Sequence, residues 1–239
     1  MLTIEYLASQ AGRGTSSSTP TRVHTVRNRD TPGVRRELAS GVSPNCINEE
    51  EATPLHTAAA SPHSQWHLVH AADRLAAQFQ ILSLLVENGA DPNARDYMHW
   101  TPLTVAVINH NIDGVALLLA AGASPSPKSD SGMMALEYGA MINARRRRVI
   151  SILIRAGAQL PRASHAEWMR ESNNGNGFEH AQAARRYVAK IAAAGSWAAY
   201  EKAHTTRLVP VFEKVFPRPR LPHEIASHVV RFCFHTGYY

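Results

Sequence analysis

The stretch Thr53-Pro54-Leu55-His56-Thr57-Ala58-Ala59 decides the fold, because a related stretch, Thr101-Pro102-Leu103-Thr104-Val105-Ala106, follows later in the chain. A threonine ahead of a helix caps it by accepting a hydrogen bond from a backbone N–H of the first turn. Proline is tolerated in that turn, where its missing N–H needs no partner. Both stretches therefore predict the start of a helix, with the leucine in a core. A weaker copy, Met134-Ala135-Leu136-Glu137-Tyr138-Gly139, comes after Thr101 and firmly keeps only the leucine.

A second repeated feature is a glycine that closes an apolar helical stretch. Glycine adopts the left-handed conformation past a helix end without steric penalty. The interval from Gly89 to Gly122 matches a known repeat period of about 33 residues. The interval from Gly122 to Gly157 is slightly longer, and that from Gly41 to Gly89 is much longer, which indicates an insertion. The start motif and the closing glycine stay in phase, so the chain is expected to be a stack of repeated units.

These motifs resemble those of the ankyrin-repeat family. The resemblance implies an all-α solenoid of about four repeats, two of them degenerate or interrupted. Residues 46–93 and 94–126 match the family pattern well, and residues 127–159 form a degenerate repeat. His56, in the start motif, is expected to satisfy backbone groups between neighbouring repeats.

Residues 1–45 are interpreted as an interrupted N-terminal repeat, with residues 4–9 as its first helix and 34–38 as its second. The segment 12–31 is rich in Gly, Ser, Thr, Pro and Arg, and is therefore expected to be a flexible insertion. An organellar transit peptide in the acid-free stretch 11–29 is a less favoured interpretation.

A second insertion, residues 61–71, falls between the two helices of the 46–93 repeat. The following residues 72–86 predict a long helix, with Leu75, Phe79, Leu82 and Val86 on one face. Both insertions are compatible with real surface loops and with errors of gene prediction, and the sequence does not decide between them.

Residues 160–239 leave the repeat pattern and are expected to form a helical C-terminal cap region, because a solenoid needs its last apolar face covered. Helices are predicted from Ser164 to about Arg170, from about Glu179 to Ala194, and from Trp197 to Phe216, the last one bent or stopped near Pro210. The final segment 221–235 resembles the opening of F-box-like helices. It therefore offers an alternative function, as the docking helix of a ubiquitin-ligase substrate adaptor.

The chain lacks the sequence features of an enzyme or of a metal or cofactor site. No phosphate-binding glycine loop or nucleophile elbow is present. His63, His67 and His70 lie close together, but no cysteine joins them, so we predict no metal site. The run Arg145–Arg148 is interpreted as a solvated helix face, with an anion-binding or nuclear-targeting patch as the alternative.

The composition of the chain limits which classes of partner and which cellular compartments are expected. Only two cysteines are present, which favours a cytoplasmic or nuclear compartment. No apolar run approaches the ~18 residues that cross a membrane. Residues 46–93 carry a net charge of −5, from one Arg against six acids, and residues 159–239 carry +5, from eleven Lys or Arg against six Glu. This segregation argues against a uniform nucleic-acid binder, although binding through the basic tail is an alternative.

The resemblance implies a monomeric protein-interaction module or scaffold, which binds another protein and no small-molecule substrate. Ankyrin stacks offer the tips of their turns and the concave face of their first helices to a partner. The predicted contact residues therefore lie in the two turns before the start motifs: Asn48, Glu49, Glu50, Glu51, Asp96, Tyr97, Met98, His99 and Trp100. For Trp100, packing against the adjoining turn is an equally weighted alternative.

Overall fold

The computed structural model describes residues 22–60, 71–142, 147–160 and 178–215 of the chain. In these ranges it forms helices and turns, with one isolated β-bridge between Lys128 and Met134. The helices are α2 Arg22–Asn28, α3 Thr31–Ala39, α4 Pro54–Ala59, α5 Ala71–Glu87, α6 Pro102–Ile108, α7 Ile112–Ala120, α8 Ala135–Ile142, α9 Arg147–Arg155, α11 Phe178–Ala193 and α12 Trp197–Val215.

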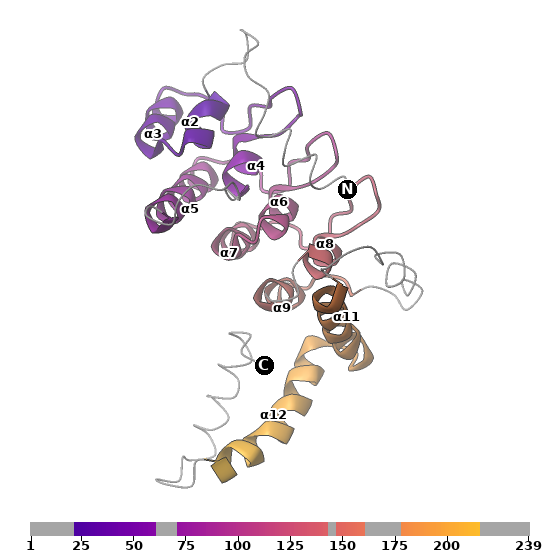
Figure 1. The fold of residues 1–239 in the computed structure, drawn as a ribbon. Coiled ribbons are helices and arrows are strands. Elements are labelled where there is room, and N and C mark those ends of the chain that lie inside the picture. The colour runs from indigo at the N-terminus through magenta and orange to yellow at the C-terminus, as the bar shows by residue number, and fades with distance from the viewer. Residues whose placement is uncertain (1–21, 61–70, 143–146, 161–177, 216–239) are drawn as a thin grey trace.

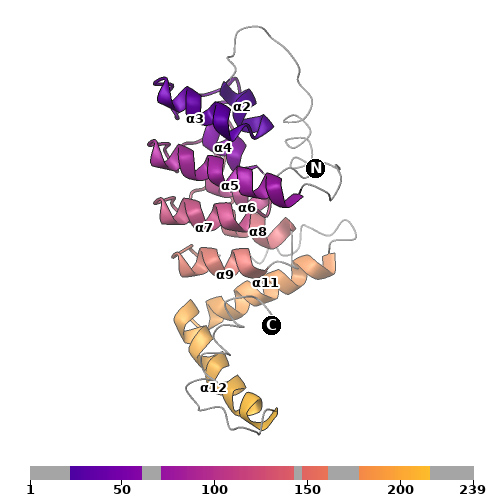
Figure 2. The same ribbon diagram turned by 90° about the vertical axis from the view of Figure 1, so that its left-hand side faces the viewer.

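The helices stack in two rows (Figures 1 and 2). The short helices α2, α4, α6 and α8 pack in sequence to form an inner row, and α3, α5, α7 and α9 form an outer row. The four helix pairs confirm the all-α solenoid of about four ankyrin-type repeats. α11 packs on α8 and thereby continues the inner row, whereas α12 leads away from the stack (Figure 1).

The start motif acts as predicted. α4 and α6 begin at Pro54 and Pro102, directly after the threonines. The hydroxyl of Thr101 accepts from the backbone N–H of Thr104 at 3.4 Å. The leucines of the three copies are at most 1% exposed: Leu55, Leu103 and Leu136. The motif therefore determines both where the inner helix begins and which residue anchors it in the core.

The closing glycines also act as predicted. All four have a left-handed φ between 83° and 89°: Gly41, Gly89, Gly122 and Gly157. After Gly41 and Gly89, an asparagine four residues further on links the loop to the next repeat. The amide of Asn45 donates to the Gly89 carbonyl at 3.0 Å and accepts from the Asp91 N–H at 2.7 Å. Asn93 repeats both bonds one repeat later, with the Gly122 carbonyl and the Ser124 N–H.

The prediction of a flexible insertion at 12–31 is wrong where the structure describes that segment. Residues 22–28 form α2, and α3 already begins at Thr31, so the first repeat has a compact helix pair. The Asp30 side chain caps α3 by accepting from the Gly33 N–H at 3.0 Å. α2 carries few apolar residues, so its hydropathy pattern is weak. Its Val26 is nevertheless buried in the core. The helix expected at 4–9 lies outside the described residues.

The long helix of the second repeat is confirmed, but only part of its apolar face is buried. Leu82 is fully buried, whereas Leu75 and Phe79 are 53% and 44% exposed. The buried stripe runs through Gln78, Ile81, Leu82 and Leu85. The hydropathy pattern missed this face because its first member is polar: Gln78 Nε2 donates to the carbonyls of Ala58 and Ala60 at 2.8 and 3.0 Å. Residues 61–70 of the second insertion lie outside the described residues.

The C-terminal helices α11 and α12 lie within one residue of the predicted bounds. Gly195 separates them with a φ of 79°. The prediction of a stop at Pro210 is wrong, because α12 continues through it to Val215. Val188 and Ile191 of α11 join the core of the stack, as a cap requires. The helices predicted at 164–170 and 221–235 lie outside the described residues.

Candidate protein-interaction surface

Three turns project from the stack ahead of α4, α6 and α8, and we call them the fingers: residues 48–51, 96–99 and 129–132. Each closes through a hydrogen bond from the backbone N–H of its first residue to the carbonyl four residues later: Asn48 to Ala52, Asp96 to Trp100 and Ser129 to Met133, at 3.0–3.1 Å. Each has a left-handed residue at its fourth position: Glu51 and His99, both with φ 55°, and Gly132 with φ 74°. The three fingers therefore share one backbone geometry.

The fingers are bonded to one another as well as closed internally. The backbone N–H of Tyr97 donates to the Glu50 carbonyl at 3.1 Å, and that of Asp130 donates to the Met98 carbonyl at 3.3 Å. The His99 ring Nδ1 also meets the Asp130 carboxylate. The fingers thus form one continuous strip, which we call the finger surface.

The structure exposes some of the predicted contact residues and buries others. Glu49, Glu51, Tyr97 and His99 are exposed, whereas Asn48, Glu50 and Met98 are partly exposed. The side chain of Asn48 has a structural role as well, because its Oδ1 accepts from the backbone N–H groups of Glu50 and Ala52 at 3.0 and 2.8 Å.

Asp96 and Trp100 are buried, at 2% and 3% exposure, so the prediction that they contact a partner is wrong for this structure. Asp96 Oδ1 accepts from the backbone N–H groups of Met98 and Trp100 at 2.9 and 2.8 Å, which shapes the finger. The indole of Trp100 packs edge-on against Tyr138 with ring centroids 5.5 Å apart, and its Nε1 donates to the Tyr138 hydroxyl at 3.2 Å. Trp100 thus has a packing role, as in the alternative prediction, but its partner Tyr138 lies on α8 of the next repeat and not in the adjoining turn.

Sequence reasoning missed the third finger. Asp130 lies on it with a side chain that is 61% exposed, next to His99. The signal was present, because Ser129 follows Asp96 at the same interval at which Gly122 follows Gly89. The weak start motif that comes after this finger concealed it.

The finger surface is acidic and has one exposed aromatic ring. Its residues include Glu49, Glu50, Glu51 and Asp130, with no Lys or Arg. Burial of part of the Tyr97 phenol raises its pKa, and the negative charges of Glu50 and Asp96 raise it further. The ring of Tyr97 therefore lies in a field of negative potential, which attracts cations.

Below the first finger, His56 joins two repeats as predicted. It is 2% exposed, its Nδ1 lies 3.1 Å from the Thr53 backbone nitrogen, and its Nε2 lies 3.0 Å from the Trp100 carbonyl oxygen. These contacts assign the proton to Nε2, so that Nδ1 accepts from the Thr53 N–H. Burial lowers the pKa of His56 and thereby favours this neutral form.

Within the described ranges, no group of three or more His, Cys, Asp and Glu is placed to hold a metal ion, and no helix is long and apolar enough to span a membrane. His63, His67 and His70 lie outside those ranges, as do Arg145 and Arg146. Arg148 is exposed on α9, and the interpretation of the whole arginine run stays a prediction.

Comparison with known proteins identifies the repeats. A family model described as ankyrin repeats (3 copies) matches residues 23–129 and 68–163. The ankyrin repeat-containing protein P1E11.10 of Schizosaccharomyces pombe is 34% identical over 90 residues, which cover 38% of this chain and 36% of that protein.

Two longer relatives match over a similar number of residues. The mitochondrial disaggregase of Bos taurus is 43% identical over 79 residues, which cover 33% of this chain and 12% of the relative. The glycerophosphocholine phosphodiesterase gde1 of S. pombe is 30% identical over 105 residues, which cover 44% of this chain and 8% of the relative. The chain thus spans well under half of the length of the relatives it matches.

Proposed function

Because the chain belongs to the ankyrin-repeat family, we propose that it binds a partner protein through its finger surface. Ankyrin repeats generally mediate protein–protein interaction, which supplies the class of function. The position of the site and the character of the partner are inferred from the geometry of the fingers.

The single observation that carries the proposal is the bonding between fingers. A contact surface built on loops loses affinity when the loops must be ordered on binding. Here the backbone bonds from Tyr97 to Glu50 and from Asp130 to Met98 order the strip in advance. The surface is thus preorganised and still exposes side chains that bind well, since aromatic rings dominate binding energy at interfaces.

The concave face contributes less than the fingers in the third repeat. Every residue of α6 from Pro102 to Ile108 is buried, so the exposed side chains of this repeat's inner side come from its finger. We therefore place the contact on the fingers first, and on the concave face only as an extension of them.

The charge of the finger surface favours a partner segment rich in lysine or arginine. Four carboxylates attract such a segment from a distance. Tyr97, 47% exposed, presents a ring on which an arginine or lysine head group stacks favourably. The carboxylates and the exposed ring together support a basic partner segment better than an apolar partner segment.

Charge reversal tests this placement. With Glu49→Lys and Glu51→Lys together, we expect the association rate with the captured partner to fall about tenfold at low salt and its salt dependence to shrink. Asp113→Lys is the matched control, because Asp113 is exposed on α7, outside the fingers. Unchanged kinetics in the double variant would show that the site lies elsewhere.

The adaptor alternative stays a prediction from sequence, since residues 221–235 lie outside the described residues. We also propose a non-catalytic role and a cytoplasmic or nuclear location. Both are supported by sequence alone, through the absence of a catalytic motif and the two distant cysteines Cys46 and Cys233.

A further inference from the structure

The seam between α11 and α12 holds a cluster of aromatic rings at the end of the stack. The Tyr187 and Tyr200 rings pack edge-on with centroids 5.8 Å apart, and the His204 ring lies 4.6 Å from that of Tyr200. Trp197 adds a third contact to Tyr200 at 6.2 Å. These contacts bring the face of α11 that carries Tyr187 against the face of α12 that carries Tyr200 and His204.

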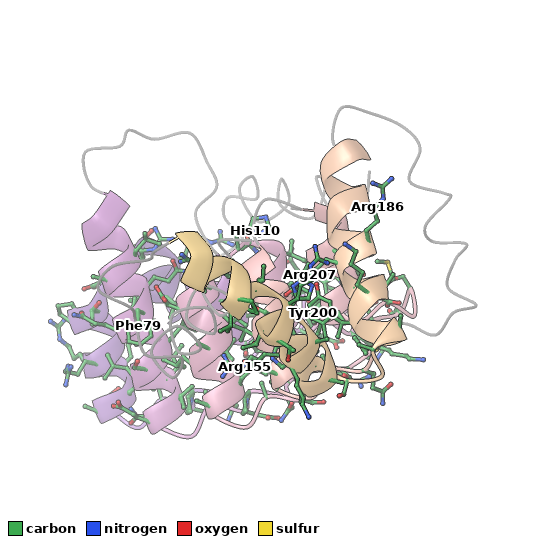
Figure 3. The ribbon with its side chains drawn as sticks, turned by 90° about the horizontal axis from the view of Figure 1, so that it is seen from below. Phe79, His110, Arg155, Arg186, Tyr200 and Arg207 are labelled. Carbon is green, nitrogen blue, oxygen red and sulfur yellow. The ribbon has the colours of Figure 1, made fainter. Side chains whose placement is uncertain are left out.

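Two cations lie on the same faces. Lys190 is one turn beyond Tyr187 on α11, and Arg207 is one turn beyond His204 on α12; residues three or four apart are neighbours on a helix. Both side chains are exposed. Tyr200 and Arg207 both lie on α12 (Figure 3). Helix geometry and the ring contacts therefore direct Lys190, His204 and Arg207 to one seam.

The electrostatics agree with this convergence. Burial lowers the pKa of His204, and the positive charges of Arg207 and Lys190 lower it further. Both cations are thus near enough to the imidazole to oppose its protonation. Three groups with positive or potentially positive charge along one seam repel one another, and an anion bound between them relieves that repulsion.

The seam suits a single oxyanion better than a nucleic acid. Non-specific binding of single strands uses aromatic rings whose faces are open to the bases. Tyr200 is only 8% exposed, and its ring packs against three others in the seam. In contrast, a lysine, an arginine and an imidazole supply a concentrated set of donors, as a phosphate or carboxylate requires.

We propose that Lys190, His204 and Arg207 form a binding site for one oxyanion, either a phosphate ester or a carboxylate, carried by a protein segment. This site is separate from the finger surface and does not depend on it. Lys190 and Arg207 supply charge, and the imidazole supplies a directed N–H. A bound anion favours the imidazolium, so binding strengthens as the pH falls, and the pKa of His204 rises when the site is filled.

The test uses the full chain and histidine ring resonances, with the His204 signal assigned through His204→Gln. Inorganic phosphate is titrated first, followed by N-acetyl-phosphoserine amide and by N-acetyl-glutamate amide. We expect phosphate to raise the pKa of His204, and Lys190→Gln with Arg207→Gln to weaken binding at least tenfold. Preferential binding of the phosphoserine compound assigns a phosphate ester, and preferential binding of the glutamate compound assigns a carboxylate; each supports the site.

Lys202→Gln is the matched control. Lys202 is exposed on α12 two residues after Tyr200, so it points away from the seam, and its substitution also removes a positive charge. An equal loss of phosphate binding in this control, or unchanged binding in the double variant, would overturn the proposal. A thymidine oligonucleotide provides a further test. The proposal would also be overturned if the oligonucleotide bound more tightly than either amino-acid compound and shifted the His204 ring resonance no more than those of other histidines. Ring signals of Tyr200 that match the wild type show that the seam stays intact in the variants.

Discussion

The second and third repeats begin alike and diverge halfway. Each has a finger, a Thr-Pro-Leu start and a closing glycine, each follows a linking asparagine, and the two inner helices pack side by side. In the third repeat the outer helix α7 has 9 residues and starts after a tight turn, in which His110 has a φ of 55° and Asn111 accepts from the Gly114 N–H at 2.9 Å. In the second repeat the outer helix α5 has 17 residues.

The difference shows which part of a repeat the motif determines. Gln78 and Asn111 occupy the same position relative to the closing glycine of their own repeat. Both donate to the end of α4, Gln78 to the Ala58 carbonyl at 2.8 Å and Asn111 to the Ala59 carbonyl at 3.4 Å. Asn111 starts a helix, whereas α5 passes through Gln78 without a break. α4 belongs to the repeat of Gln78 but precedes the repeat of Asn111, so the motif determines neither the contacts of this position nor the start of the outer helix.

The strongest test of this comparison is a pair of leucines on α5. Leu82→Ala should lower the free energy of unfolding by about 3 kcal/mol, because it opens a cavity in the core. Leu75→Ala should change it by less than about 0.5 kcal/mol, because Leu75 is 53% exposed. Urea unfolding followed by circular dichroism measures both. Equal losses would mean that the extended part of α5 is buried and that the assigned face is wrong.

A smaller difference in stability is expected between variants of the two start motifs. His56 reaches the next repeat through the Trp100 carbonyl, whereas Thr104, at the same position of the third repeat, meets Thr101 of its own repeat at 3.2 Å. His56→Ala should cost about 2 kcal/mol of stability, because it leaves buried backbone groups without partners, and Thr104→Ala about 1 kcal/mol. Urea unfolding of the two variants measures the difference, and an equal cost would contradict the inter-repeat role of His56.

The same histidine makes stability depend on pH. The folded state lowers the pKa of His56, so the unfolded chain binds the proton more tightly. The stabilising contribution is complete above the ordinary histidine pKa of about 6.5 and is lost progressively as the pH falls below it. The urea midpoint of the wild type should therefore decrease from pH 7 to pH 5 more steeply than that of His56→Ala. Parallel decreases would contradict the assignment of a neutral, buried imidazole.

Much of the fold could be predicted from the chain because its signals are local. A threonine cap, a proline in the first turn and a left-handed glycine act within a few residues, and each behaves as expected. The helix at 22–28 in the first repeat was missed for the opposite reason. α2 has a weak apolar pattern, and the stronger signal appears only by comparison with a distant repeat, where Asn111 and Gly114 correspond to Asp30 and Gly33.

The candidate site was predicted in part. Exposure of Glu49, Glu51 and Tyr97 followed from their place in turns. The burial of Asp96 and the packing partner of Trp100 could not follow, because they depend on backbone groups within the finger and on Tyr138, which belongs to the next repeat. The seam of α11 and α12 was not predicted either, since it depends on how two helices face each other.

The most direct test of the finger surface compares two exposed aromatic residues. Tyr97 is 47% exposed on a finger and Phe79 is 44% exposed on the outer helix α5. A photoreactive phenylalanine is placed at each position in turn, and cross-links to the purified partner are measured by mass spectrometry. We predict cross-links from position 97 that basic peptide competes away, and few from position 79. Cross-links that come mainly from position 79 would place the partner on the outer helices and contradict the account.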